Sequence, residues 1–144
     1  MKLSLKLSAL TLALAFSANV FAHGAVTPQA IDTSTIPQLG EEWADTNPYR
    51  DVDGDTKSEI IRVGASAYNQ NCARCHGLEA ISGGIAPDLR YLASDFDGDE
   101  WYVYRVKNGA VRNGAVYMPK MTEHLSQEAL WAVRSFVESV AVAQ

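Results

Sequence analysis

Residues 72–76 read Cys72-Ala73-Arg74-Cys75-His76, and this pentapeptide decides how the rest of the chain is interpreted. It contains both cysteines of the 144-residue chain. A disulfide that closes so short a loop would restrict the unfolded chain very little and would stabilise the protein weakly. The two thiols and the histidine that follows them therefore need another explanation.

Attachment of a haem explains all three side chains. Two thiols at this spacing can add to the two vinyl groups of one porphyrin, and His76 is then held beneath the iron as an axial ligand. The motif predicts one haem c, covalently bound to Cys72 and Cys75 and ligated by His76. The flat apolar macrocycle would become part of the core, which helps a domain of this size to be stable.

Three other uses of the motif agree less well with the sequence. A dithiol redox site is usually found in an alternating strand and helix pattern, which this sequence does not show. A structural zinc site requires ligands in pairs, and there is no second pair of cysteines. A plain disulfide leaves the neighbouring histidine without a role.

The residues around the motif favour helices. Apolar and small side chains recur at helical spacing over residues 58–70, so we expect a helix that ends directly before the motif. A second helix is expected over residues 97–107, where Asp97 and Asp99 can cap the N-terminus and Asn108-Gly109 supplies the stop.

The last helix is expected to begin at Ser126, a favourable N-cap, with Leu125 and Leu130 placed for a hydrophobic staple. One apolar stripe follows along this helix: Leu130, Val133, Phe136, Val137 and Val140. Residues 77–91 and 110–124 are expected to be loops. No segment shows a strand pattern, so the sequence predicts a mainly α domain.

The first 22 residues have the pattern of a cleaved secretory signal. Lys2 and Lys6 precede an apolar stretch, residues 7–20, and cleavage is expected after Ala22. The apolar stretch is shorter than the ~20 residues needed to span a bilayer. We therefore expect export to the periplasm, with no membrane anchor after cleavage.

Residues 23–57 are rich in proline, glycine, threonine and acidic side chains and show little apolar periodicity. They are expected to form an extended acidic N-terminal arm that lies over the domain of residues 58–144. Five side chains are candidates to anchor this arm: Ile31, Ile36, Leu39, Trp43 and Tyr49.

The arm contains acidic residues that alternate like the opening of a calcium loop: Asp51, Asp53 and Asp55. The pattern then fails, because glycine stands at position 4 rather than 6 and Arg62 occupies position 12. A solvated acidic loop is the expectation, and calcium binding is the alternative.

The formal net charge is −5, and loss of the two lysines of the signal makes it −7. This balance disfavours nucleic acid, because phosphate contacts need basic patches. It suits a diffusible carrier that meets its partners through local charge complementarity. Arg105, Lys107, Arg112 and Lys120 flank the segment around Met118, where they form either a basic collar for an acidic partner or scattered solvated charge.

A second axial ligand can come from the segment before the last helix, which holds three candidates: Met118, Met121 and His124. Two strong axial ligands suit an electron carrier, because a closed coordination sphere reorganises little when the oxidation state changes. A methionine ligand also raises the reduction potential relative to a second histidine.

From about Glu59 to the C-terminus the sequence resembles the mitochondrial-type, or class I, cytochromes c. In that family a helix with a glycine and an aromatic residue precedes the attachment motif, as Gly64 and Tyr68 do here. Phe136 would be the matching aromatic of the C-terminal helix. The resemblance implies a cytochrome c-like fold, in which crossed N- and C-terminal helices surround a covalently bound haem.

The resemblance also implies two roles near the iron. Pro87-Asp88-Leu89 matches the family's Pro-x-Leu, and its proline carbonyl is expected to accept a hydrogen bond from Nδ1–H of His76. Met118-Pro119 matches the Met-Pro pair that supplies the sixth ligand, so Met118 is favoured over Met121. His124 is expected to lie at the surface.

A narrower resemblance concerns the arm, with its segment of residues 47–55, and the loop of residues 108–119. These resemble the periplasmic cytochromes that accept electrons from pyrroloquinoline-quinone (PQQ)-dependent alcohol dehydrogenases, ethanol dehydrogenase especially. The resemblance implies a one-electron carrier with no catalytic residues of its own, which passes electrons to a terminal oxidase or another cytochrome. An open-site haem enzyme or gas sensor, and a fixed cytochrome subunit of a dehydrogenase complex, are the alternatives.

Overall fold

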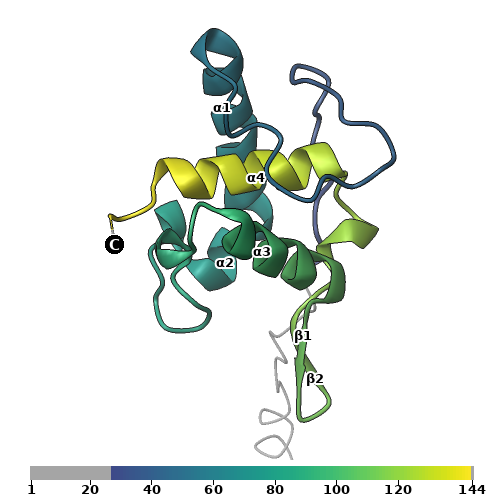
Figure 1. The fold of residues 1–144 in the computed structure, drawn as a ribbon. Helices are drawn as coiled ribbons and strands as arrows, with labels where there is room; N and C mark the ends of the chain where they lie inside the picture. Colours follow the sequence, from purple (N-terminus) through teal and green to yellow (C-terminus); the bar gives the residue numbers. More distant parts are fainter. Residues whose placement is uncertain (1–26, 144) are drawn as a thin grey trace, which may run out of the picture.

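The computed structural model describes residues 27–143, so the expected signal segment, residues 1–22, lies outside the described residues. The described chain is mainly helical, as predicted (Figure 1). Its α-helices are α1 (Gly54–Asn71), α2 (Ala73–His76), α3 (Phe96–Asn108) and α4 (Gln127–Ser139). The short elements are the 3-10 helices η1 (Leu78–Ala80), η2 (Leu89–Tyr91) and η3 (Met121–Glu123) and the strands β1 (Ala110–Arg112) and β2 (Ala115–Met118). Within residues 27–143, no helix is both long and apolar enough to cross a membrane.

The core lies where α4 crosses α1 (Figure 1). Gly64 of α1 permits the close approach, because a Cβ at this position would lie 1.9 Å from the carbonyl oxygen of Ala132 on α4. Near this point the ring centroids of Tyr68 and Phe136 are 5.1 Å apart and the rings are tilted by 48°, a favourable arrangement for an aromatic pair. The crossed helices implied by the family resemblance are confirmed.

Helix α4 begins as predicted. Ser126 is its N-cap, and its hydroxyl accepts a hydrogen bond from the backbone N–H of Ala129 at 3.3 Å. The expected apolar stripe is buried from Leu130 to Val137, and Val140 after the last turn is half-buried. Helix α4 is therefore buried over most of its length, and α1, α3 and η2 contact it.

Helix α1 begins at Gly54, four residues before the expected start, so the expected end of the arm at residue 57 falls inside the helix. The positive φ of Gly54, +60°, lets the chain turn from the extended Asp53 into the helix. Residues 54–57 carry no apolar side chain. The periodicity that marks the rest of the helix could not reveal this first turn.

Helix α3 begins at Phe96, and its N-cap is Asp95, whose side chain accepts a hydrogen bond from the backbone N–H of Gly98 at 3.0 Å. The prediction that Asp97 and Asp99 cap this helix was wrong. Both lie inside the first turn, and Asp99 is fully buried. Its carboxylate therefore serves the tertiary structure rather than the helix end.

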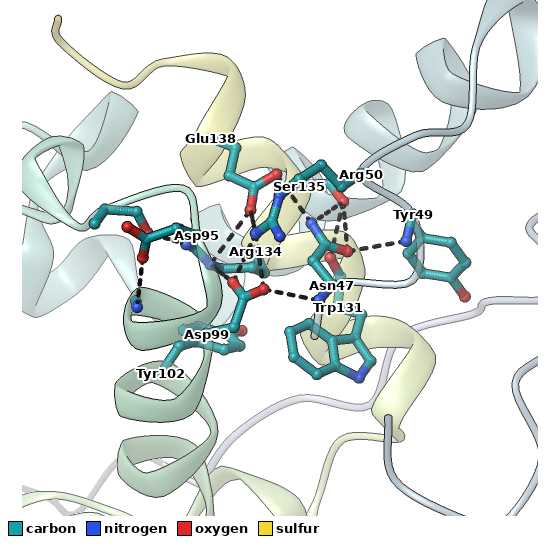
Figure 2. Close-up of polar contacts among 12 residues, drawn as sticks. Asn47, Tyr49, Arg50, Asp95, Asp99, Tyr102, Trp131, Arg134, Ser135 and Glu138 are labelled. Atoms are coloured by element: carbon teal, nitrogen blue, oxygen red, sulfur yellow. Dashed lines mark hydrogen bonds and ion pairs between the residues drawn. The ribbon is translucent and has the colours of Figure 1, made fainter. Parts of the chain in front are cut away.

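Asp99 belongs to a buried ionic cluster that joins the arm to α3 and α4 (Figure 2). Its carboxylate lies 2.8 Å from Nε of the fully buried Arg134 and 2.8 Å from Nη2 of Arg50. Arg50 also pairs with Glu138 at 2.5 Å, and the backbone N–H of Asn47 donates to Asp99 at 2.9 Å. Two acids and two bases thus balance in charge where three segments distant in sequence meet.

Residues 27–53 contain no helix or strand and pack against the core. Ile36 and Tyr49 are buried, and the other three expected anchors are partly buried against the core: Ile31, Leu39 and Trp43. The Tyr49 hydroxyl donates to the carbonyl of Pro37 at 2.6 Å. The arm therefore belongs to the folded unit.

The prediction that no strands are present was wrong, because residues 110–118 form an antiparallel hairpin within the segment expected to be a loop. Asn113 and Gly114 at its turn both have positive φ, 50° and 77°, which is the requirement of a type I′ turn. An Asn-Gly pair between apolar residues is a strong hairpin signal, and it would have revealed the strands. The hairpin ends at Met118, so it positions one of the ligand candidates.

Candidate haem site

The attachment motif follows α1 without a break. Cys72 is the C-cap of α1, and the backbone N–H groups of Cys75 and His76 both donate to its carbonyl, at 3.1 and 3.0 Å. This single turn of helix places the three side chains at spacings of three and four residues, so they share one face. The two cysteines do not form a disulfide with each other. This turn therefore places two cysteine side chains and an imidazole where a single ligand could bind all three.

Cys72 does not have the character of the reactive thiol of a dithiol redox pair. Burial raises the pKa of Cys72 to about 12, whereas a reactive thiol of such a site has a pKa lowered toward neutrality. Cys72 also packs partly buried against the apolar core. Its position at the edge of the core agrees with attachment of an apolar group there.

The ring of His76 is oriented by the chain itself. Its Nδ1 lies 2.8 Å from the carbonyl oxygen of Pro87, which confirms the hydrogen bond implied by the family resemblance. A carbonyl can only accept, so Nδ1 carries the proton and the lone pair of Nε2 is left for a metal. Such a bond fixes the ring and strengthens its donation to a metal.

The chain turns sharply directly after His76. Gly77 has a φ of +81°, and a Cβ there would lie 1.8 Å from the carbonyl oxygen of Ile81. The hydroxyl of Tyr68 donates to the carbonyl of Gly77 at 2.8 Å and so ties this turn to α1. The turn starts the loop that carries Pro87 back to the histidine.

The three candidates for the second axial ligand differ in environment. Met121 is 3% exposed and belongs to the apolar core. Met118, at the end of β2, is only half-buried, and His124 is exposed, as expected. Met118 is therefore the methionine whose side chain is least committed to the core.

Exposed apolar side chains follow the motif and lie on the hairpin that ends at Met118. They range from 48% to 75% exposed: Leu78, Ile81, Ile85, Val111, Val116 and Tyr117. Large apolar side chains left exposed beside a site can contact an apolar ligand. The two thiols and the oriented imidazole lie on one helical turn and fit the attachment of a haem.

Other sequence candidates do not form a second site. Asp51, Asp53 and Asp55 are exposed, and within residues 27–143 no three His, Cys, Asp or Glu side chains are grouped to hold a metal ion. Of the four basic residues around the Met118 segment, three lie over aromatic rings, while Lys120 is exposed. The pairs are Arg105 with Trp101, Lys107 with Trp43, and Arg112 with Tyr117.

Comparisons with known proteins agree with this geometry. Residues 59–137 match the family described as cytochrome C oxidase, cbb3-type, subunit III. Cytochrome c550 of Pseudomonas aeruginosa is 62% identical over 130 residues, which cover 90% of this chain and 88% of that protein. The chain belongs to the cytochrome c family. This cytochrome c therefore carries a covalently attached haem c and functions in electron transport.

Part of this cytochrome c is also similar to larger enzymes. Two quinohemoprotein alcohol dehydrogenases of Pseudomonas putida match it, one at 46% identity over 44 residues and one at 35% over 81 residues. The matched segments cover 31% and 56% of this chain but only 6% and 11% of the enzymes. No solved structure gives a significant match.

Proposed function

We propose that this cytochrome c is a periplasmic one-electron carrier whose haem is bonded to Cys72 and Cys75 and ligated by His76 and Met118. The observation that carries the assignment is the 2.8 Å contact between Nδ1 of His76 and the carbonyl of Pro87, on the same helical turn as both thiols. Two axial ligands supplied by the protein close the coordination sphere of the iron, which suits electron transfer. In this proposal the protein has no catalytic residues of its own, and its signal segment is removed after Ala22.

We further propose that a PQQ-dependent alcohol dehydrogenase is the electron donor. Support comes from the quinohemoprotein alcohol dehydrogenases, in which a segment similar to this chain is part of the enzyme itself. A separate cytochrome c with a related segment can serve a dehydrogenase that lacks its own haem portion. The acceptor is a terminal oxidase or another cytochrome.

The electron count sets what the carrier must do. A haem c exchanges one electron between its ferric and ferrous states. Oxidation of an alcohol to an aldehyde releases two electrons, so two molecules of the carrier, or two visits by one, are needed for each turnover.

Stopped-flow reduction tests the donor assignment. The oxidised cytochrome is mixed with a substrate-reduced quinoprotein alcohol dehydrogenase, and haem absorbance reports the rate over a range of ionic strength. An unrelated reduced dehydrogenase of similar net charge is the control. We expect rapid reduction by the quinoprotein alone, and equal rates with both enzymes would refute the donor assignment while leaving the cytochrome intact.

A further inference from the structure

The carbonyl that orients His76 lies in a loop without regular structure. Residues 81–88 form neither helix nor strand, and a Cβ added at Gly83 or Gly84 would meet no atom within 4 Å. Proline has no N–H, so Pro87 cannot be held through a backbone donor of its own. Other groups must keep its carbonyl 2.8 Å from Nδ1 of His76.

Ser82 forms hydrogen bonds with the residues on both sides of Pro87. Its hydroxyl donates to the carbonyl of Ala86 and accepts from the backbone N–H of Gly84 at 2.9 Å. Its own backbone N–H donates to the carboxylate of Asp88 at 3.2 Å. The loop is thereby closed into a ring from Ser82 to Asp88, with Pro87 between two fixed neighbours.

Asp88 connects this ring to the rest of the molecule. Its carboxylate accepts from the backbone N–H and from Nε and Nη2 of Arg90, at 3.1, 3.0 and 2.8 Å. The carbonyl of Arg90 in turn accepts from the N–H of Val142, after the end of α4. The ring is therefore tied through Asp88 and Arg90 to the segment that follows α4.

We propose that Ser82 and Asp88 are positioning residues that hold the Pro87 carbonyl on Nδ1 of His76 and so set how strongly this histidine donates to the haem iron. The inference rests on the proposed ligation by His76. A carbonyl held in place strengthens the imidazole as a ligand, and hydrogen bonding around a ligand tunes the reduction potential of haem iron. A loop free to move would weaken this bond and raise the potential.

The test uses the holoprotein labelled with ¹⁵N-histidine. In Ser82→Ala the hydroxyl is lost, in Ser82→Thr it is kept, and Asp88→Asn removes the charge that binds Arg90. Ser58→Ala is the matched control, because the Ser58 hydroxyl also donates to a backbone carbonyl, that of Gly54 on the exposed side of α1. The measurements are solvent exchange of the His76 ring N–H in the ferrous protein, the midpoint potential and the melting temperature.

We expect Ser82→Ala and Asp88→Asn to accelerate exchange of the ring N–H by about tenfold, the effect of losing one hydrogen bond, and to raise the midpoint potential. Ser82→Thr should restore both quantities, and Ser58→Ala should change neither. If Ser82→Ala does not retain haem, Asp88→Asn is compared with Ser58→Ala in its place. Exchange and potential equal to those of Ser58→Ala, whatever the melting temperature, would overturn the inference.

The same spectra distinguish this inference from the ligand assignment. Iron ligation predicts that the His76 ring resonances shift strongly between the ferrous and ferric states. A strong shift with unaltered exchange in both variants refutes only the roles of Ser82 and Asp88. Absence of the shift in the unmodified protein refutes ligation by His76, and the inference that depends on it.

Discussion

At the scale of single residues, the two methionines near the end of the chain have different environments although they are three positions apart. Met121 is 3% exposed within the apolar core, and Met118 is half-buried at the end of a strand. Their truncation should therefore produce opposite results. One should affect mainly the haem iron and the other mainly the stability of the protein.

Met118→Ala should abolish the absorption band assigned to sulfur–iron charge transfer and open the iron to rapid binding of cyanide or carbon monoxide. Met121→Ala should keep the band but lower the free energy of unfolding by about 2–5 kcal/mol, as expected for a buried methionine. Absorption spectra, ligand binding and denaturant unfolding of the two holoproteins separate these effects. The reverse pattern would assign the sixth ligand to Met121.

The carboxyl of Asp88 gives a prediction on pH. Its hydrogen bonds with Arg90 lower the pKa of Asp88 from an ordinary 3.8 to about 2. The folded pKa is depressed, so the stability that Asp88 contributes is present above about pH 3.8 and is lost as the pH falls toward 2. Arg90→Gln should return the titration of Asp88 toward 3.8, as followed by ¹³C NMR of its carboxyl group.

Glu59 provides the internal control for this titration. Its pKa is also lowered to about 2, mainly by hydrogen bonds from Arg62, and Arg62 is unaffected by a change at Arg90. The titration of Glu59 should therefore stay in place in Arg90→Gln. Equal shifts in the pKa values of Asp88 and Glu59 would show a general effect of charge rather than the loss of the specific pair between Asp88 and Arg90.

At the scale of elements, the crossing of α1 and α4 depends on the absence of one side chain. A Cβ at Gly64 would lie 1.9 Å from the backbone oxygen of Ala132. A backbone atom in a buried helix cannot move aside as a flexible side chain can. The helices would have to separate, and the contact between Tyr68 and Phe136 would be disturbed with them.

Gly64→Ala should lower the free energy of unfolding by about 3 kcal/mol, in the upper part of the range for overpacking a core. Gly83→Ala is the matched control, because a Cβ at Gly83 meets no atom within 4 Å. Denaturant unfolding of the two holoproteins makes the comparison. Similar stabilities would show that the helix crossing adapts without strain.

At the scale of the whole molecule, the arm is joined to the helices by the ionic cluster around Asp99 (Figure 2). Arg134 is fully buried, and its Nη1 has no hydrogen-bond partner in the described structure. Its charge is balanced at close range by the carboxylate of Asp99, at 2.8 Å, and at longer range by Glu138, at 3.5 Å. Arg50 is 27% exposed in its side chain, so water screens its pairs more and its loss should have a smaller effect.

Asp99→Asn should destabilise the protein by about 3–5 kcal/mol, because it removes the closest carboxylate of the buried Arg134 and leaves only the longer pair with Glu138. Arg50→Gln should instead loosen mainly the arm, and hydrogen exchange at the amides of Asn47 and Tyr49 would report it. Arg62→Gln, which breaks an exposed pair with Glu59, is the control and should leave exchange in the arm unchanged. Equal exchange in both arginine variants would show that the arm is held by its apolar anchors alone.

The sequence by itself determined the features that depend on a few neighbouring residues. The attachment motif, the existence of the three longer helices and the Ser126 cap all follow from patterns that repeat within one or two helical turns. The family resemblance added the bond between His76 and Pro87 and the crossing at Gly64. The Asn113-Gly114 turn was equally local, and its signal was available in the sequence.

Only the tertiary structure decided the roles that depend on distant partners. Asp99 has the local pattern of a residue at a helix start, yet its charge pairs with Arg134, 35 positions away. Met118 and Met121 are the same residue type, and only their different burial in the fold distinguishes them. The physical reason is that hydrogen bonds within a turn need only adjacent residues, whereas burial and ion pairing require the packing of elements that no short window of sequence contains.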